Sequence, residues 1–162
     1  MPFILFVCTA NRFRSPIAAL YFAREVVRRG EDQDTQVASA GTWASPGQPA
    51  MPKAVQLAKE YGLDLSYHKS RIVSEDLLVQ SDLILVMEGG HKEALRHEFP
   101  GTADRVYLLT EVVEDLTVNI PDPYGEAQAD PEEVVKEIVG LIDDGYEQLL
   151  SLANKMENKR SQ

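Results

Sequence analysis

The chain has 162 residues, of which 44% are hydrophobic and 26% are charged, and its formal net charge is −10. These values fit one soluble domain with a real core and argue against nucleic acid or an anionic membrane as the main partner. Its one cysteine, Cys8, excludes an internal disulfide and favours a reducing compartment. No run has the length of a membrane span or the pattern of a signal peptide, so we expect a cytoplasmic protein without a membrane partner.

Four short runs, rich in apolar residues, predict strands, and helical patterns lie between them. The runs are Phe3–Val7, Gln36–Ser39, Leu83–Met87 and Arg105–Leu108. Strands that alternate with helices predict an α/β fold: a doubly wound, four-stranded parallel sheet flanked by helices. In such a sheet, ligands bind at the carboxyl ends of the strands, and Cys8 lies just past such an end.

Several helix boundaries are visible in the sequence. A helical pattern from Ala54 stops at Gly62, and the last helix begins with Asp130 as its N-cap and Pro131 as its first residue. The polar stretch from Asn154 is expected to fray. We therefore predict a single domain over residues 1–157 and a polar tail over residues 158–162.

The segment from Cys8 to Pro16 carries the chemistry. Arg14 follows Cys8 after five residues, and Ser15 and Pro16 are typical of the N-cap and first position of a helix. Backbone N–H groups of such a strand-to-helix loop can turn inward to bind an anion, and the helix dipole adds positive potential. Arg14 can grip two phosphate oxygens, and the same field stabilises the thiolate of Cys8, which can attack phosphorus.

A second interpretation competes with the catalytic one. A lone cysteine after a buried strand is usually a small core residue, and the spacing to Arg14 alone leaves both interpretations open. The strand before Cys8, Ser15 and Pro16 after it, and Asn11 within the loop favour catalysis. Asn11 suits a tight loop because asparagine tolerates left-handed backbone.

The stretch Val7–Ala18 resembles the phosphate loop of the low-molecular-weight protein tyrosine phosphatases. Four later segments resemble that family in the family's order: Ser39–Thr42, His68–Arg71, Ser81–Met87 and Asp122–Gly125. The resemblance covers nearly the whole chain and includes a related branch of bacterial protein-arginine phosphatases. It implies a flavodoxin-like, three-layer fold and metal-independent hydrolysis through a phosphocysteine intermediate.

The resemblance also implies the roles of single residues. Cys8 would be the nucleophile, Arg14 the phosphate clamp and Asp122 the general acid, although the local sequence of Asp122 by itself favours a simple turn. The phosphate would be held by the loop residues Thr9, Ala10, Asn11, Arg12, Phe13, Arg14 and Ser15. A supporting hydrogen-bond network would comprise Asn11, Ser15, Ser39 and His68. The cleft would be lined by Arg12, Trp43 and Tyr124.

Three positions depart from the family pattern. Ala10 stands where many members have glycine. Its methyl group restricts the loop backbone, and we expect the loop to tolerate this restriction. Phe13 stands where many members have a second cysteine, so oxidised Cys8 would lack an internal disulfide partner. Arg12 replaces the aliphatic residue of the tyrosine-specific members and the threonine of the arginine branch. Its charge should disfavour phosphoarginine and favour acidic phosphopeptides.

We rank phosphotyrosine protein first as substrate and phosphoarginine protein second. A further alternative is an arsenate reductase, which would have to use an external thiol because the chain has no cysteine besides Cys8. The last alternative is a non-catalytic phosphate-binding module. Inorganic phosphate is expected as product and inhibitor. We expect a monomer, no cofactor and no metal, because no His, Cys or Asp cluster has ligand spacing. His91 and His97 receive no functional role.

Overall fold

The computed structural model describes residues 1–31 and 34–162, and a sheet of four parallel strands forms the centre of this part. The strands are β1 (Phe3–Cys8), β2 (Gln36–Gly41), β3 (Leu83–Val86) and β4 (Val106–Leu108), in the order β2-β1-β3-β4. The four predicted runs are therefore strands, with ends within two residues of the prediction. The predicted α/β sheet is confirmed.

The central strand β1 places the carboxyl end of the sheet. Phe6 lies opposite Ser39 of β2 on one side and Leu85 of β3 on the other. Ile4, Phe6 and Cys8 pack on one face of the sheet, whereas Phe3, Leu5 and Val7 pack on the other. The chain first runs to β2 and later to β3, so a topological switch point lies at the end of β1, where Cys8 stands.

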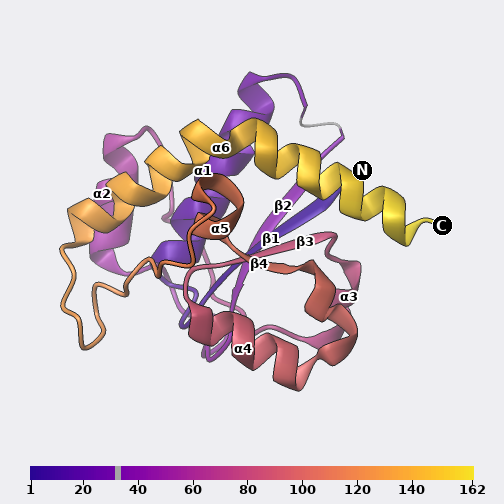
Figure 1. Cartoon of the computed structure of the whole chain (residues 1–162). Coiled ribbons are helices and arrows are strands. Elements are labelled where there is room, and N and C mark those ends of the chain that lie inside the picture. The colour runs from indigo at the N-terminus through magenta and orange to yellow at the C-terminus, as the bar shows by residue number, and fades with distance from the viewer. Residues whose placement is uncertain (32–33) are drawn as a thin grey trace.

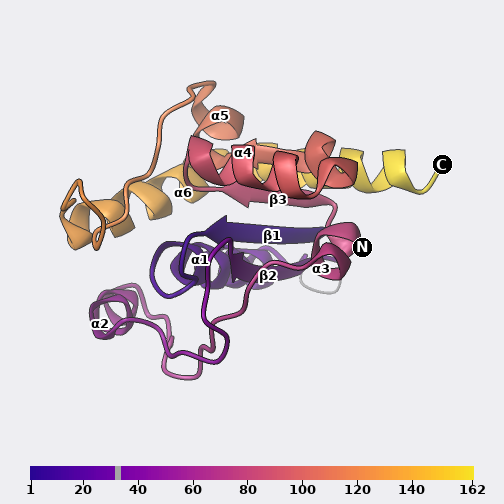
Figure 2. The same cartoon turned by 90° about the horizontal axis from the view of Figure 1, so that it is seen from below.

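Helices cover both faces of the sheet. The face of Phe6 packs against α1 (Arg14–Arg28), α2 (Pro52–Glu60), α5 (Leu109–Glu114) and α6 (Pro131–Arg160). The opposite face packs against α3 (Glu75–Gln80) and α4 (Gly89–Glu98), and the short helix η1 (Pro100–Arg105) follows α4. Figure 1 shows α1 and α6 above the strands and α3 and α4 below them, and Figure 2 shows these layers from below, with α4 in front of α6.

Aromatic and charged contacts join α1 to α6. The Phe22 ring stacks on Tyr146 with 5.1 Å between the centroids, and the Arg29 guanidinium lies 3.9 Å from the Tyr146 centroid. The Tyr21 hydroxyl donates to Asp143 at 2.5 Å. Burial, followed by this carboxylate, raises the pKa of Tyr21 to about 12.

The two ends of α6 differ in how well they were predicted. Its start is confirmed, because the Asp130 side chain accepts from the Glu132 N–H at 3.0 Å and Pro131 is the first helical residue. The prediction of fraying from Asn154 was wrong, because α6 continues to Arg160. Met156 is buried, and Arg160 pairs with Asp82 next to β3. Residues 158–162 are exposed and polar.

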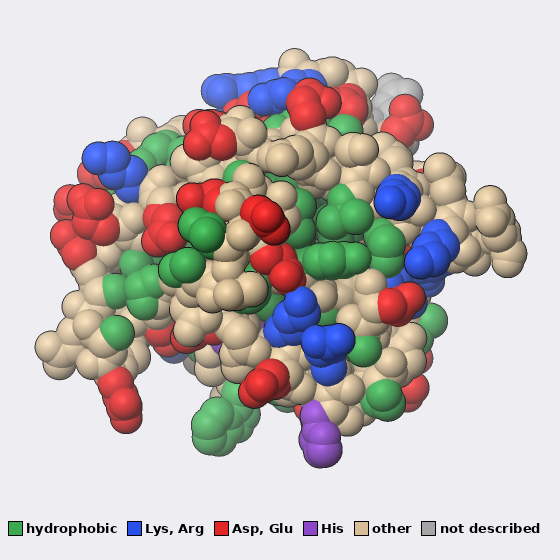
Figure 3. All heavy atoms as spheres, in the orientation of Figure 1, with side chains coloured by type: hydrophobic (Ala, Val, Ile, Leu, Met, Phe, Trp, Pro, Cys, Tyr) green, Lys and Arg blue, Asp and Glu red, His purple; other side chains and the backbone are tan. Residues whose placement is uncertain are grey.

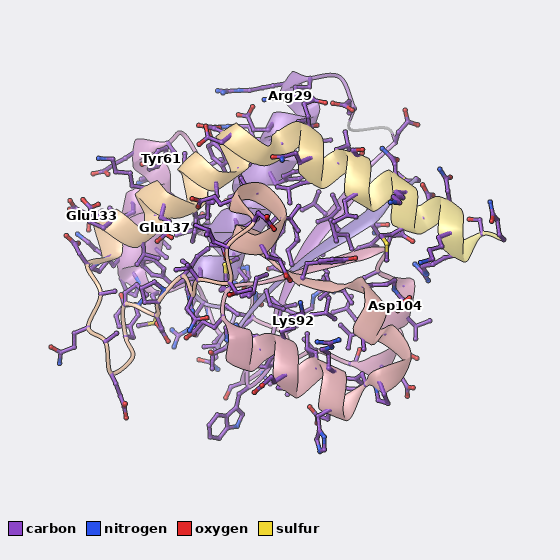
Figure 4. The ribbon with its side chains drawn as sticks, viewed as in Figure 1. Arg29, Tyr61, Lys92, Asp104, Glu133 and Glu137 are labelled. Carbon is purple, nitrogen blue, oxygen red and sulfur yellow. The ribbon has the colours of Figure 1, made fainter. Side chains whose placement is uncertain are left out.

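Acidic side chains gather at one end of helix α6. Figure 3 shows acidic side chains around the N-terminal part of α6, where Figure 4 labels Glu133 and Glu137. Burial and the nearby Glu114 raise the pKa of Glu137. None of the helices in residues 1–31 and 34–162 is long and apolar enough to cross a membrane.

Candidate active site

The loop between β1 and α1 is held closely by the segment after β2. The N–H groups of Thr42 and Trp43 donate to the carbonyls of Cys8 and Thr9 at 2.9 and 3.0 Å. Gly41 lies directly beneath, where a Cβ atom would stand 2.4 Å from the Thr9 oxygen. Only glycine leaves room for this approach of two backbones.

Asn11 turns the loop and joins it to three other segments. Its φ of 58° is left-handed, as expected, and Ala10 keeps an ordinary backbone. The Asn11 amide donates to the hydroxyls of Ser15 and Ser39, both at 2.9 Å, and its Oδ1 accepts from the Arg71 N–H at 3.0 Å. His68 donates through Nε2 to the Asn11 carbonyl at 2.7 Å. The structure thus brings the four residues of the predicted network together.

The backbone around Asn11 leaves donors available for a ligand. Among the contacts of residues 1–31 and 34–162, the N–H groups of residues 10–13 have no protein acceptor. These groups lie in a short loop that ends at the N-terminus of α1. This is the arrangement of a backbone anion site.

The predicted N-cap at Ser15 was wrong. Helix α1 begins at Arg14, and Phe13 takes the N-cap position without a side-chain hydrogen bond. The Ser15 hydroxyl lies 2.9 Å from the Cys8 Sγ instead and accepts from Asn11. A capping side chain must fold back onto the N–H groups of its own helix, and Ser15 faces the cysteine. Its hydrogen bond from Asn11 agrees with the predicted place of Ser15 in the supporting network.

Arg14 is the most connected side chain of the site and is only 2% exposed. Its Nη1 donates to Glu88 Oε2 at 2.7 Å and to the Ile120 carbonyl at 2.8 Å. Its Nη2 lies 3.4 Å from Thr9 Oγ1 and 3.7 Å from Asp122 Oδ2. Arg14 therefore joins the loop after β1 to the start of α4 and to the segment that carries Asp122.

Glu88 and His91 are site residues that the sequence analysis missed. Glu88 is the N-cap of α4, and its N–H donates to His91 Nδ1 at 3.1 Å. The His91 Nε2 lies 2.8 Å from Thr9 Oγ1. Burial, and next the charge of Arg14, lower the pKa of His91 to about 4, against the opposing effects of Glu88 and Asp122. Glu88 and His91 are three residues apart, which is the spacing of a capping box and could have predicted their contact with each other. No sequence pattern could have predicted their contacts with Thr9 and Arg14.

A pocket of about 100 Å³ opens at Cys8. It is lined by Cys8, Ala10, Arg12, Phe13, Arg14, Met51, Asp122 and Tyr124. The side chain of Asp122 is 32% exposed, and its Oδ1 accepts from the Tyr124 N–H at 2.9 Å. Tyr124 meets Phe13 edge-on with 5.8 Å between the ring centroids. One pocket therefore contains the predicted nucleophile, the predicted cation and the predicted acid.

Of the predicted cleft residues, Trp43 lies outside the pocket, and Arg12 lines it with a contact that was not predicted. Trp43 is 84% exposed and is not among the residues that line the pocket, whereas Met51, which was not predicted, lines it. Trp43 is held by its backbone rather than its ring, so the ring stays in solvent. Arg12 lines the pocket as expected, and its Nε donates to the Pro49 carbonyl at 2.8 Å.

The described part of the chain contains no group of three or more His, Cys, Asp or Glu side chains that could hold a metal ion. The donors around the pocket are the guanidinium groups of Arg12 and Arg14 and the backbone N–H groups of the loop. Such donors suit a phosphate group, whose oxygens carry the negative charge.

Comparison with known proteins agrees with this geometry. A model of the family "Low molecular weight phosphotyrosine protein phosphatase" matches residues 3–161. The protein-arginine-phosphatase of Bacillus subtilis is 37% identical over 122 residues, which are 75% of this chain and 79% of that protein. The low molecular weight protein-tyrosine-phosphatase Wzb of Escherichia coli K12 is 36% identical over 125 residues, which are 77% and 80% of the two chains.

Solved structures show the same fold. A YwlE mutant from Bacillus subtilis has a TM-score of 0.84 at 33% identity, over 92% of this chain and 99% of that one. The low molecular weight protein tyrosine phosphatase from T. tengcongensis has a TM-score of 0.82 at 37% identity, over 91% and 99%. The extent of these matches, together with the family model, shows that this chain belongs to the low molecular weight phosphotyrosine protein phosphatase family.

Proposed function

We propose that this family member hydrolyses phosphotyrosine in proteins through a phosphocysteine intermediate. The observation that carries the proposal is the shared pocket, in which Cys8, Arg14 and Asp122 line one space of about 100 Å³. We also propose a monomer as the active unit.

In the first step, the Cys8 thiolate attacks phosphorus. The S–P bond forms while the bond from phosphorus to the tyrosyl oxygen breaks, and Asp122 gives its proton to that oxygen. Arg14 and the free N–H groups of residues 10–13 would stabilise the charge on the three remaining phosphoryl oxygens. The Ser15 hydroxyl, 2.9 Å from Sγ, is placed to stabilise the thiolate as attacking and leaving group.

In the second step, water attacks the phosphocysteine. Asp122, now a carboxylate, takes a proton from the water as the S–P bond breaks. This step regenerates the thiolate of Cys8 and releases inorganic phosphate. The released phosphate fits the site that held the phosphoryl group, so inorganic phosphate should inhibit competitively.

The pocket walls support an aromatic substrate. Phe13, Met51 and Tyr124 offer apolar surface around the nucleophile, which suits the ring of a phosphotyrosine. Arg12 adds a second cation to the wall, and no carboxylate in the described residues forms an ion pair with it. This charge opposes the cationic guanidinium of a phosphoarginine and attracts acidic residues that flank a phosphotyrosine.

Phosphoarginine in proteins is the second candidate substrate. The observation that favours it is the 37% identity to the Bacillus subtilis protein-arginine-phosphatase, which is similar to the 36% identity to Wzb. The two candidates share all the chemistry at phosphorus and differ in the leaving group, which is a nitrogen in phosphoarginine.

The test measures phosphate release from a phosphotyrosine peptide and a phosphoarginine peptide in parallel, with a chelator present. Cys8→Ser should abolish turnover, and Asp122→Asn should lower kcat by about 10² to 10⁴. Arg12→Thr and Arg12→Ile form a matched pair: both remove the charge, and we expect Arg12→Thr to raise the relative rate on phosphoarginine. Neutral and acidic versions of the phosphotyrosine peptide measure the attraction by Arg12.

Faster turnover of phosphoarginine by the wild-type chain would reverse the substrate order. If neither peptide is hydrolysed, thiol consumption that depends on arsenate would identify a reductase, and phosphate binding without turnover would identify a binding module. Either result would overturn the proposed phosphatase activity.

A further inference from the structure

His91 and Thr9 both lie outside the pocket lining, but the Thr9 hydroxyl contacts His91 on one side and Arg14, which lines the pocket, on the other. We propose that His91 is a positioning residue: its neutral imidazole donates from Nε2 to Thr9 and thereby fixes the Thr9 hydroxyl as an acceptor for Arg14. The inference rests on the proposed function in one respect, because Arg14 must bind the phosphoryl group for its orientation to affect turnover.

The backbone of Glu88 determines which nitrogen of His91 carries the proton. The Glu88 N–H points at His91 Nδ1 over 3.1 Å, and an N–H group can only donate. Nδ1 must therefore accept with its lone pair, which places the proton of the neutral ring on Nε2. The Nε2–H then donates to Thr9 Oγ1 at 2.8 Å.

This donor constrains the Thr9 hydroxyl. The Thr9 hydroxyl oxygen has two lone pairs. One accepts from His91, and the other faces Arg14 Nη2 at 3.4 Å. Because both neighbours donate, the hydroxyl hydrogen must point away from Arg14. Without His91, the hydroxyl could rotate its hydrogen toward Arg14, and Nη2 would lose this acceptor. Among the described residues, Asp122 Oδ2, at 3.7 Å, would then be the remaining polar contact of Nη2.

The surroundings of His91 keep the ring neutral. Its side chain is 7% exposed, Arg14 of α1 is close, and a second proton on Nδ1 would meet the Glu88 N–H. The carboxylates of Glu88 and Asp122 favour the charged ring, but burial and Arg14 prevail, and the pKa of His91 falls to about 4. The relay from His91 through Thr9 to Arg14 is therefore present at neutral pH.

Three variants separate this relay from the capping of α4. In His91→Asn the amide oxygen can still accept from the Glu88 N–H, but the side chain is too short for Thr9. In His91→Gln the amide nitrogen can reach the position of Nε2. Thr9→Val removes the hydroxyl with almost no change of shape. We expect His91→Asn and Thr9→Val each to lower kcat by about tenfold and to weaken inhibition by inorganic phosphate, with His91→Gln restoring most of the loss.

The double variant His91→Asn/Thr9→Val tests whether the two residues act as one unit. A single relay predicts that the double variant is no slower than either single variant. Multiplied effects, or single variants within about twofold of the wild type, would overturn the inference. Thermal melting accompanies each assay, because a purely structural cap would lower the melting temperature and leave phosphate inhibition unchanged.

Nitrogen-15 NMR of the three histidines tests the tautomer without any activity measurement. We expect the His91 signals, assigned by their loss in His91→Asn, to be those of a neutral Nε2–H ring from about pH 6 to pH 8. A proton on Nδ1, or a cationic ring at about pH 6, would refute the relay. If the wild-type chain hydrolyses no phosphopeptide, the proposed function fails, and the NMR result still decides whether His91 donates to Thr9.

Discussion

Replacing Gly41 with alanine should damage the phosphate loop although Gly41 does not line the pocket. A Cβ atom at this position would lie 2.4 Å from the Thr9 carbonyl oxygen and 3.0 Å from the Asn11 nitrogen. Both are backbone atoms of the loop, so no side chain can rotate away to relieve the contact. Either the loop or the strand β2 must move.

The size of this movement follows from the contact distance. Ordinary contact begins near 3.4 Å, so the Thr9 oxygen must recede by about 1 Å. A displacement of about 1 Å in a catalytic constellation can cost about 10²-fold in rate. Crowding in a packed region also destabilises by about 1 to 3 kcal/mol. We therefore expect Gly41→Ala to lower kcat/KM by about 100-fold while the protein remains folded.

The assay compares phosphate release and chemical unfolding for Gly41→Ala and a matched control, Gly140→Ala. Gly140 lies within α6, and a Cβ atom there would meet nothing within 4 Å. The control should keep wild-type activity and gain up to about 1 kcal/mol of stability, since alanine favours a helix interior. If Gly41→Ala keeps kcat/KM within about twofold of the wild type, the close approach does not constrain the loop and the reasoning fails.

Three further changes probe other contacts. Glu88→Gln weakens the contact that orients the Arg14 guanidinium, and we expect this loss to outweigh the gain in net positive charge. It should lower kcat/KM by about tenfold with little change in melting temperature, and unchanged kinetics would exclude a role for this ion pair. In the wild-type chain, the raised folded-state pKa of Tyr21, about 12, contributes stability that is complete below pH 10 and is lost as the pH rises through 12. Tyr21→Phe removes this contribution, so its unfolding free energy should fall less steeply between pH 10 and 12. Equal slopes for the two proteins, measured by urea unfolding across this pH range, would contradict the reasoning. Arg160→Met should cost about 1 kcal/mol through its contact with Asp82 and leave kcat/KM unchanged, and equal stability by urea unfolding would show that the end of α6 contributes nothing.

The loop after β1 could be predicted because its chemistry is local in the sequence. Cys8, Asn11 and Arg14 lie within seven positions of one another, between a strand and a helix that each have their own sequence pattern. The position of Ser15 shows the limit of this approach. Its residue type suits an N-cap, but its hydroxyl contacts Cys8 Sγ at 2.9 Å, and the helix starts at Arg14, two residues before the predicted first position, Pro16.

Contacts between distant segments could not be predicted from local patterns. Glu88 is 74 positions from Arg14, and His91 is 82 positions from Thr9, so their meeting depends on the pairing of β1 with β3. The same limit applies at the end of α6, where the polar composition after Asn154 favours fraying. The partner that holds the last turn, Asp82, is 78 positions away in the sequence, so no local pattern near residue 160 indicates it.

The net charge of −10 opposes the binding of an anionic substrate only at long range. At physiological ionic strength, exposed charges are screened over about 8 Å, so the acidic side chains around α6 act weakly on a phosphate inside the pocket. Arg14 is 2% exposed, and its charge is screened far less. Glu88 offsets part of that charge at 2.7 Å, so the free N–H groups of residues 10–13 must provide much of the attraction. The charge of the whole chain should therefore affect how fast a substrate arrives, whereas the loop backbone and Arg14 decide whether its phosphate is held.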